Sequence, residues 1–490
     1  MSESRPWAVP VARGVVVAAA AAGLVVGADR LGAAPDATPP SGGGSSAATT
    51  LTTSYCPGDP FAGGDDETPD VDVSGSVDAH AAPVDVLEGV VRPADDPGRI
   101  TIDPLSTATS GVPRDSSTSG PTDVSDDDLG PDPLRVRGTG ERAPGLVATQ
   151  SLTATDGDVQ GLAALPCTTP TADAWLVAGG GDKGRQERLV LTNPGGNAVT
   201  VQVDVVGAKG GGSDGPGRSV VVPAGGRNVV LLDSIGGTAA PQAVHVTSTG
   251  GLVTSAIVDH HLDGLTPAGL DVVGPTAAPA RRLVLPGNAN GSGRGIVVAA
   301  PGDREAVVQV RRLSEHPARS AKVVTVPAGQ AVDVELPLAD GMRSWVVESD
   351  EPVVAAAWTE TTGAGGRADM AWSVATPAFG SLGGAALPRV PEEVSRRFVE
   401  VTAADGPAQV DVLVSRDGEV TTEELELDDA RSQALPLGDA DAVWVRPEDG
   451  RVHAAVLYLS PPGAQTVGAA SVPLLPSRVA VRDVPVVRAP

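Results

Sequence analysis

The feature that most constrains this chain is an internal repeat of about 100 residues within its C-terminal two thirds. A pair of apolar segments occurs three times, with the same spacing between its two members each time. The three pairs are Val244–Ser248 with Leu252–Ile257, Trp345–Ser349 with Val353–Trp358, and Trp444–Pro447 with Val452–Leu457. Because each copy of a repeat buries the same hydrophobic face, the three copies are expected to share one fold.

Other landmarks recur in the same order. Each copy has an opening strand, at Leu189–Leu191, Ile296–Val298 and Phe398–Val401, and a closing strand before proline, at Leu270–Pro275, Trp372–Pro377 and Ala469–Pro473. Each copy therefore offers about seven or eight short strands, separated by Gly, Pro, Asn or Asp. This rhythm predicts an all-β chain of tandem immunoglobulin-like β-sandwiches. The alternative is a β-propeller in which each copy supplies two blades.

These patterns divide the chain into seven parts. We expect a cytoplasmic tail at 1–13, a membrane segment at 14–28, a flexible stalk at 29–53, an irregular acidic region with some strands at 54–160, and β-sandwich repeats at 161–286, 287–388 and 389–490. The stalk is expected because its Pro, Gly, Ser, Thr and Ala lack apolar periodicity. The acidic region has strand-like alternation, but it also contains a polar stretch at 106–133 that is typical of disorder.

The amino terminus predicts export. Arg5 and Arg13 precede the uncharged, apolar stretch Gly14–Ala28, and acidic sequence dominates afterwards. Positive charge before an apolar segment places the amino terminus in the cytoplasm and the remainder outside. We therefore expect a single-pass membrane protein with its bulk outside the membrane. The alternative is a signal peptide, since its apolar region has about this length, and the protein would then be secreted after cleavage.

The composition indicates which residue types form the cores and argues against one class of partner. Hydrophobic residues make up 41% of the chain but aromatic residues only 2%, so the cores must consist mainly of Val, Leu and Ala. The five tryptophans beyond the membrane segment all lie in predicted strands: Trp175, Trp345, Trp358, Trp372 and Trp444. We expect them in the cores of the sandwiches. The alternative is that they form an aromatic binding platform. A net charge of −26 without a basic stripe argues against a nucleic-acid partner.

Two cysteines, Cys56 and Cys167, are the only ones in the chain. An exported protein meets an oxidising compartment, which favours a structural disulfide between them. Neither belongs to a CxxC motif, so metal binding by these cysteines is not expected.

One cluster offers ligands for a metal ion. In the segment Asp259–Asp263, strand alternation places Asp259, His261 and Asp263 on one face, and these residue types bind divalent ions. The corresponding segments of the other two copies, at 359–361 and 459–460, lack histidine. The three residues are therefore weak metal candidates, and a solvated strand end is the competing interpretation.

Three further patterns match catalytic or cofactor-binding motifs in sequence, but the structure predicted around them does not suit those functions. Gly179, Gly181 and Gly184 have the spacing of a dinucleotide-binding loop, but a strand is predicted to follow them instead of the required helix. Ser213 stands in a G-x-S-x-G pattern inside a glycine-rich loop, which predicts a hairpin tip. The carboxylate pairs Glu392–Glu393 and Glu423–Glu424 are expected on exposed loops or edges. No cofactor and no catalytic residue are predicted.

Several segments of the sequence resemble a known family. Pro166–Pro170, Asp173–Gly180 and Leu189–Gly195 are similar to segments of the domain of unknown function 5719, an actinobacterial family of uncharacterised secreted proteins. The resemblance implies a membrane-anchored envelope protein without an assigned activity. With the repeat, it indicates a non-catalytic structural or interaction protein that contacts an envelope polymer or another protein. The alternatives are an envelope-active hydrolase and a metal-binding or solute-binding protein.

Overall fold

The structure is a computed structural model of the 490-residue chain, and nearly all of its regular structure is β. It describes residues 46–482, except 62–72, 94, 106–114, 118–121, 127–128, 156, 182, 209–216, 237–239, 290, 338–340, 395 and 462. The all-β prediction is confirmed. The helices in the described part are single turns: α2 (Val84–Leu87), η1 (Gly140–Arg142), α3 (Asp233–Gly236), η2 (Ala364–Gly366) and η3 (Glu392–Val394).

The unit at 173–273, called sandwich 2, shows the architecture most clearly. Its strands are β10 (Asp173–Ala178), β11 (Arg185–Asn193), β12 (Val199–Gly207), β13 (Arg218–Val222), β14 (Gly226–Leu231), β15 (Gln242–Thr249), β16 (Thr254–Asp263) and β17 (Thr266–Val273). They form two antiparallel sheets, in the orders β10-β15-β12-β13 and β14-β11-β16-β17. Consecutive strands such as β10, β11 and β12 alternate between the two sheets, as in a sandwich, whereas the blades of a propeller are built from consecutive strands.

Sandwich 3 and sandwich 4 repeat this order. Sandwich 3 contains β18 (Ala280–Asn288), β19 (Gly293–Ala300), β20 (Ala306–Leu313), β21 (Arg319–Val326), β22 (Gln330–Glu335), β23 (Arg343–Thr362) and β24 (Ala368–Val374). Sandwich 4 contains β25 (Gly383–Ala386), β26 (Arg396–Ala403), β27 (Ala408–Arg416), β28 (Glu419–Leu427), β29 (Arg431–Pro436), β30 (Ala442–Asp449), β31 (His453–Leu459), β32 (Ala469–Pro473) and β33 (Leu475–Pro476). The long β23 corresponds to two strands of the other units, because its two halves pair within different sheets.

Residues 51–166 form a further unit of the same kind, sandwich 1. Its strands are β2 (Leu51–Cys56), β3 (Val73–His80), β4 (Ile100–Pro104), β5 (Asp115–Ser117), β6 (Thr122–Asp126), β7 (Leu134–Thr139), β8 (Val147–Ala154) and β9 (Gly161–Pro166). Their order, β2-β7-β4-β5 and β6-β3-β8-β9, is that of sandwich 2. The chain therefore contains a fourth copy in the region that we expected to be irregular.

Two predicted boundaries differ from the structure. The first repeat was expected to begin at 161, but β9 pairs with β8 and belongs to sandwich 1. The stalk was expected to extend to 53, but β1 (Ser46–Ala48) pairs with β34 (Ala480–Arg482), and β2 begins at Leu51. The membrane segment at 14–28 and the tail before it lie outside the described residues. No helix among residues 46–482, with the gaps given above, is long and apolar enough to cross a membrane.

Each sandwich has a core of aliphatic side chains between its two sheets. In sandwich 2, Val201 and Val203 of one sheet and Leu189 and Ile257 of the other belong to one buried cluster. Strand alternation explains this core, because every second residue of β12 is apolar and points inward. Four of the five predicted core tryptophans are buried: Trp175, Trp345, Trp372 and Trp444.

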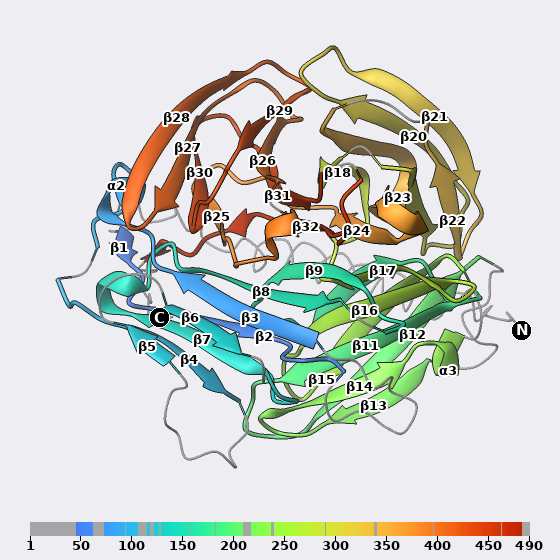
Figure 1. The fold of residues 1–490 in the computed structure, drawn as a ribbon, viewed down its shortest axis with the longest axis horizontal. Helices are drawn as coiled ribbons and strands as arrows, with labels where there is room; N and C mark the ends of the chain where they lie inside the picture. Colours follow the sequence, from blue (N-terminus) through green and yellow to red (C-terminus); the bar gives the residue numbers. More distant parts are fainter. Residues whose placement is uncertain are drawn as a thin grey trace, which may run out of the picture. The chain divides into compact units, whose positions relative to one another are not determined.

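The sandwiches meet along one edge strand each. These strands, here called the inner strands, are β9, β17, β24 and β32, and their labels lie near the centre of Figure 1. Each inner strand contacts at least two others, so that β9, β17, β24 and β32 form a closed circle. This circle brings segments more than 300 residues apart in sequence next to each other.

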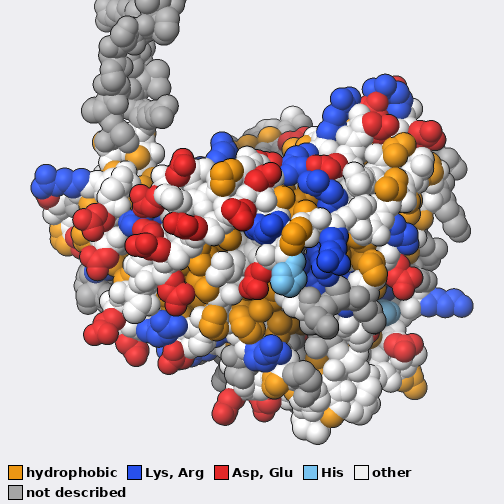
Figure 2. All heavy atoms as spheres, turned by 90° about the horizontal axis from the view of Figure 1, so that it is seen from above, with side chains coloured by type: hydrophobic (Ala, Val, Ile, Leu, Met, Phe, Trp, Pro, Cys, Tyr) orange, Lys and Arg blue, Asp and Glu red, His pale blue; other side chains and the backbone are white. Residues whose placement is uncertain are grey.

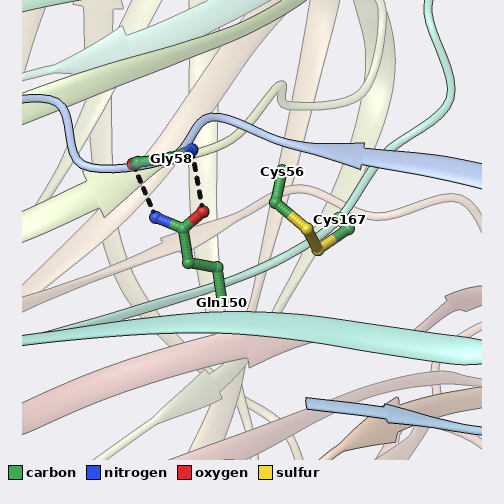
Figure 3. Close-up of a disulfide and its surroundings, with 4 residues drawn as sticks. All are labelled: Cys56, Gly58, Gln150 and Cys167. Atoms are coloured by element: carbon green, nitrogen blue, oxygen red, sulfur yellow. Dashed lines mark hydrogen bonds between the residues drawn. A yellow bond between two sulfur atoms is a disulfide. The ribbon is translucent and has the colours of Figure 1, made fainter. Parts of the chain in front are cut away.

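The predicted disulfide is present. Cys56 at the end of β2 and Cys167 just after β9 are bonded, with 4.5 Å between their Cα atoms and 111 residues between them in sequence. Figure 3 shows the bond beside a second clamp, in which the Gln150 amide donates to the Gly58 carbonyl at 2.8 Å and accepts from its N–H at 3.0 Å. Both links fasten the end of β2 and the residues just after it to β8 and to the end of β9.

Candidate functional site: buried carboxylates between the sandwiches

A buried ion pair lies where sandwich 2 meets sandwich 3. Arg185 at the start of β11 donates from Nε to Asp259 Oδ1 on β16 at 2.7 Å, and its Nη2 contacts Asp259 Oδ2. The indole N–H of Trp372, on β24 of sandwich 3, donates to Asp259 Oδ2 at 2.7 Å. The Asp259 side chain is fully buried, while that of Arg185 is 17% exposed. The pairing of β11 with β16 places Arg185 opposite His261 and Glu187 opposite Asp259, so Arg185 reaches Asp259 diagonally across the two strands.

A second carboxylate lies close to this pair. Glu187 is fully buried, accepts the backbone N–H of Gly180 at 2.8 Å and contacts the amide nitrogen of Gln242. Its Oε1 lies 4.0 Å from Nε of Arg185. Burial, followed by the negative charge of Asp259, raises the pKa of Glu187 to about 7. The group can therefore hold a proton near neutral pH.

A third carboxylate, Asp369, lies within the circle of inner strands. It accepts the backbone N–H of Leu162 on β9 at 2.9 Å, of Leu270 on β17 at 3.0 Å and of Ala469 on β32 at 2.8 Å. Asp369 itself belongs to β24, so one side chain joins all four inner strands. Burial raises the pKa of Asp369 to about 8, although the N–H donors act in the opposite direction.

The three other inner strands have glycine just before the residue that donates to Asp369. These glycines are Gly161, Gly269 and Gly468. A Cβ atom on Gly161 would lie 2.3 Å from Oδ1 of Asp369, and one on Gly269 would lie 2.7 Å from the nitrogen of Met370. The space beside the four strands therefore accommodates one side chain, and sandwich 3 supplies it.

A fourth buried carboxylate connects sandwich 3 with sandwich 4. Glu400 on β26 accepts the backbone N–H of Gly287 at 2.9 Å and the hydroxyl of Ser432 at 2.7 Å. Its side chain is fully buried, and this burial raises its pKa to about 7. The remaining junctions have polar links of their own. Arg227 of sandwich 2 donates to the Pro57 carbonyl of sandwich 1 at 3.0 Å.

The predicted metal cluster does not assemble. Asp259 is occupied by Arg185 and Trp372, while Asp263 is exposed at the end of β16. A bulge lies between the pairs His261–Gly269 and Leu262–Pro267, and its extra residue, Ala268, belongs to β17. Burial, together with the charge of Arg185, lowers the pKa of His261. Among the described residues, no group of three or more His, Cys, Asp or Glu side chains is arranged to hold a metal ion.

The other motifs also have structural explanations. The turn at Gly179–Gly184 leads into strand β11, so no helix is present there to hold a pyrophosphate. A Cβ atom on Gly179 would lie 1.9 Å from the guanidinium carbon of Arg185, so glycine is needed here to make room for the buried ion pair. Ser213 and its glycines lie outside the described residues.

The carboxylate pairs and the remaining tryptophan lie at the surface or near it. Glu423 and Glu424 are exposed on the edge strand β28, and Glu392 and Glu393 are exposed in η3. Trp358 is half-buried and donates its indole N–H to Asp333 at 3.1 Å. On the face seen in Figure 2, acidic side chains gather towards the left and are mixed with basic ones towards the right, with no continuous basic stripe.

Sequence reasoning missed Asp369, Glu400 and Arg185. Asp369 lies just before the closing strand Trp372–Pro377 of its copy, outside the landmarks that recur, and nothing in the sequence singled it out. Arg185 and Glu400 gave no signal either, since charged residues next to strands are usually solvated. Their importance depends on partners from other sandwiches.

The arrangement of these buried carboxylates is suited to holding strands together. Asp259, Glu187, Asp369 and Glu400 are buried, and each accepts hydrogen bonds from the protein itself. A general acid, a general base or a nucleophile must reach a substrate atom within hydrogen-bond distance. Glu187, Asp369 and Glu400 instead satisfy buried backbone N–H groups, and Asp259 accepts from the side chains of Arg185 and Trp372.

Comparison with known proteins gives a family but no activity. The sequence model of DUF5719, a family of unknown function, matches residues 121–438. No curated protein matches the chain.

Among solved structures, "Crystal Structure of Thermotoga maritima 1070" is 17% identical, covers 20% of this chain and 93% of its own, and has a TM-score of 0.18. "Crystal structure of tetra-tandem repeat in extending region of large adhesion protein" is 13% identical, covers 88% of this chain and 100% of its own, and has a TM-score of 0.10. Similarity this low supports no conclusion about function.

Proposed function

This chain belongs to the DUF5719 family of unknown function, and we propose that it is a non-catalytic structural or interaction protein displayed outside the membrane of a bacterial cell envelope. The observation that supports this proposal best is the internal use of the buried carboxylates. Asp369 alone joins four inner strands through hydrogen bonds to the backbone. Such groups preserve a fixed arrangement of sandwiches, which is what a display scaffold requires.

The compartment is supported by two independent features. The Cys56–Cys167 disulfide is of the kind that persists in oxidising compartments. The charge pattern of the amino terminus, with Arg5 and Arg13 before an apolar stretch, favours translocation of the remainder of the chain. A membrane anchor is our proposal, and a cleaved signal peptide with a secreted product is its alternative.

The outer edge strands are the proposed contact surfaces for an envelope polymer or a protein partner. β13, β21 and β28 each end their sheet and pair with one neighbour only. Edge strands bind extended partners through their free backbone groups. On β28 the exposed glutamates Glu423, Glu424 and Glu426 favour a cationic partner segment and discourage pairing between copies of β28.

Localisation can be tested with reporters fused to the carboxyl end of the full chain. Alkaline phosphatase, which folds only where disulfides form, should be active, and a green fluorescent protein fusion should be dark. The matched control replaces Arg5 and Arg13 with Glu, which should reduce phosphatase activity because the positive flank is lost. A fluorescent fusion in which Cys56 and Cys167 are reduced would contradict the proposed location outside the membrane.

The absence of catalysis can be tested with purified full-length protein and isolated cell-wall polymer. We expect the protein to sediment with the polymer without releasing soluble sugar or peptide fragments. Release of such fragments by the unmodified chain and equally by Glu424→Gln, an exposed control, would overturn the non-catalytic proposal and favour the hydrolase alternative.

A further inference from the structure

The outer edge strand of sandwich 3 carries positive charge. Among the described strands, β21 pairs with β20 and with no other. It contains two exposed cations, Arg319 and Lys322, and no acidic residue. The Lys322 amine donates to the Glu335 carbonyl at 3.2 Å and keeps two further N–H donors. Arg319 lies within ion-pair distance of no described carboxylate.

The outer edge strand of sandwich 4 carries the opposite charge. Among the described strands, β28 pairs with β27 alone. It has no basic residue, and its four glutamates are all exposed: Glu419, Glu423, Glu424 and Glu426. No described cation lies within ion-pair distance of any of them. The edges of sandwich 3 and sandwich 4 are therefore complementary in charge.

Part of β21 is also regular enough to accept another strand. A bulge at Ala321 interrupts the pairing of β21 with β20, and Lys322–Val326 is the regular segment beyond it. Within this segment Val324 packs against the core, whereas Val323 is 61% exposed. A strand placed beside β21 would cover part of this exposed apolar side chain.

The two edges have the same position in homologous sheets, whose orders begin β21-β20-β23 and β28-β27-β30. Half a turn about an axis perpendicular to the sheets therefore brings them together antiparallel, with their core-facing sides on one side of the joined sheet. Lys322 lies opposite the core residue Val310, and Glu423 lies opposite the core residue Val412. Both charged residues thus belong to the core-facing side, and one register sets them opposite each other.

The corresponding edge of sandwich 2 is a poorer match for β28. Its strand β13 has one cation, Arg218, whose Nη1 already donates to Ser234 Oγ at 2.7 Å. In Figure 1, β21 and β28 lie on the outer side of different sandwiches, away from the inner strands. A pairing between them therefore joins separate chains.

We propose that β21 of one chain pairs antiparallel with β28 of a second copy, so that their sheets become continuous. The inference rests on the proposed use of the outer edge strands as contact surfaces, and it names the partner. Free backbone groups of both edges supply the hydrogen bonds. Opposite charges select this pair over β21 with β21 or β28 with β28, in which like charges meet. Because each chain has both edges, the copies associate head to tail into chains or rings.

The first test is sedimentation velocity of the purified full chain over a range of concentrations. At low ionic strength we expect species larger than a dimer to increase with concentration, and added salt to reduce them, because it screens exposed charges. A chain that remains monomeric at every concentration, or that stops at a dimer, would overturn the inference. The proposed function would still stand if the same protein sediments with cell-wall polymer.

Cross-linking locates the contact. A carbodiimide joins a lysine amine directly to a neighbouring carboxylate, and Lys322 is one of only three lysines in the chain. In a mixture of isotope-labelled and unlabelled chains, mass spectrometry should detect Lys322 of one copy joined to Glu423 of the other. Cross-links between copies that involve other lysines and not Lys322 would place the contact elsewhere and contradict the pairing.

Charge reversal tests whether the two edges recognise each other. Glu423→Lys with Glu424→Lys reverses the local charge of β28, and Arg319→Glu with Lys322→Glu reverses that of β21. Each variant alone should self-associate at least about tenfold more weakly, because like charges then face each other. An equimolar mixture of the two variants should associate again, since each reversed edge meets its complement. This recovery also shows that both variants are folded.

A matched control separates the edges from the charge of the whole chain. Glu392→Lys with Glu393→Lys, exposed in η3, makes the same change of charge as the β28 variant and should leave association unchanged. Equal loss of association in this control, or no recovery in the mixture of the two edge variants, would show that β21 and β28 do not pair.

Discussion

The carboxylate of Asp369 accepts the backbone N–H of Leu162 at 2.9 Å across a separation of 207 residues. The same carboxylate reaches two further inner strands, so its removal leaves backbone donors from three sandwiches unsatisfied. Because an unpaired buried donor costs about 1–3 kcal/mol, Asp369→Ala should lower the free energy of unfolding by at least about 3 kcal/mol. Urea denaturation measures this change. Asp439→Ala, whose side chain is 93% exposed, should change it by less than about 0.5 kcal/mol.

Gly161 should tolerate alanine poorly for the same structural reason. Its φ is +150°, and a Cβ atom there would lie 2.3 Å from Asp369 Oδ1. Gly157 also has a positive φ, of +75°, but no atom lies within 4 Å of the position of its Cβ. Gly161→Ala should therefore lower the melting temperature more than Gly157→Ala. Equal effects would show that backbone conformation, and not contact with Asp369, decides the outcome.

The Arg185–Asp259 pair should show strong coupling in a double-mutant cycle. Breaking a buried pair leaves an uncompensated charge, so Arg185→Met and Asp259→Asn should each cost about 3–5 kcal/mol, and the double variant should cost less than their sum. Arg304 and Glu351 form a more exposed pair, with 68% and 17% of their side chains accessible, and its coupling should be about 0.2–1 kcal/mol. Additive effects at Arg185 and Asp259 would contradict the pairing.

The disulfide should make a large contribution to stability. It closes a loop of 111 residues, for which the chain-entropy estimate is about 4.7 kcal/mol. Cys56→Ser with Cys167→Ser should lower the free energy of unfolding by about 2–5 kcal/mol. Alkylation before and after reduction, followed by intact mass measurement, should detect no free thiol in the native protein. A protein that alkylates fully without reduction would refute the bond.

Glu400 should make stability depend on pH in an unusual direction. Its pKa is raised by burial from 4.5 to about 7, so between these values the unfolded chain releases a proton that the folded protein retains. The contribution is fully present below pH 4.5 and is lost as the pH rises through 7, by roughly 3 kcal/mol at most. Glu400→Gln should flatten this decline in denaturation curves between about pH 4.5 and 7.5. Glu424→Gln, exposed on β28, should not.

The predictable part of this fold followed from local periodicity. Alternating Val and Leu in segments such as Val201–Val205, with turn residues between them, specify strands with one buried face. The same reasoning found the repeat of three copies, whereas the pairing of Cys56 with Cys167 followed from their being the only two cysteines of a chain expected to be exported. It missed sandwich 1, because its acidic and polar connections obscure the landmarks that the other copies share.

The candidate site could not be predicted to the same extent. For Asp259, the neighbouring His261 and Asp263 suggested a metal ion, and the sequence contains no sign that Arg185 and Trp372 would occupy the carboxylate. In the structure Asp259 is buried against Arg185 and Trp372, whereas Asp263 is exposed at the end of β16. Such contacts depend on how sheets from different sandwiches face each other.

Residue types and their spacing were enough to predict the all-β character, the aliphatic cores, the disulfide and the membership of an uncharacterised family. That four sandwiches meet along β9, β17, β24 and β32, with Asp369 buried among them, emerged from the three-dimensional arrangement alone. The difference lies in the range of the interactions. Strand periodicity is local, whereas the environment of a buried charge is set by donors that arrive from distant positions in the sequence.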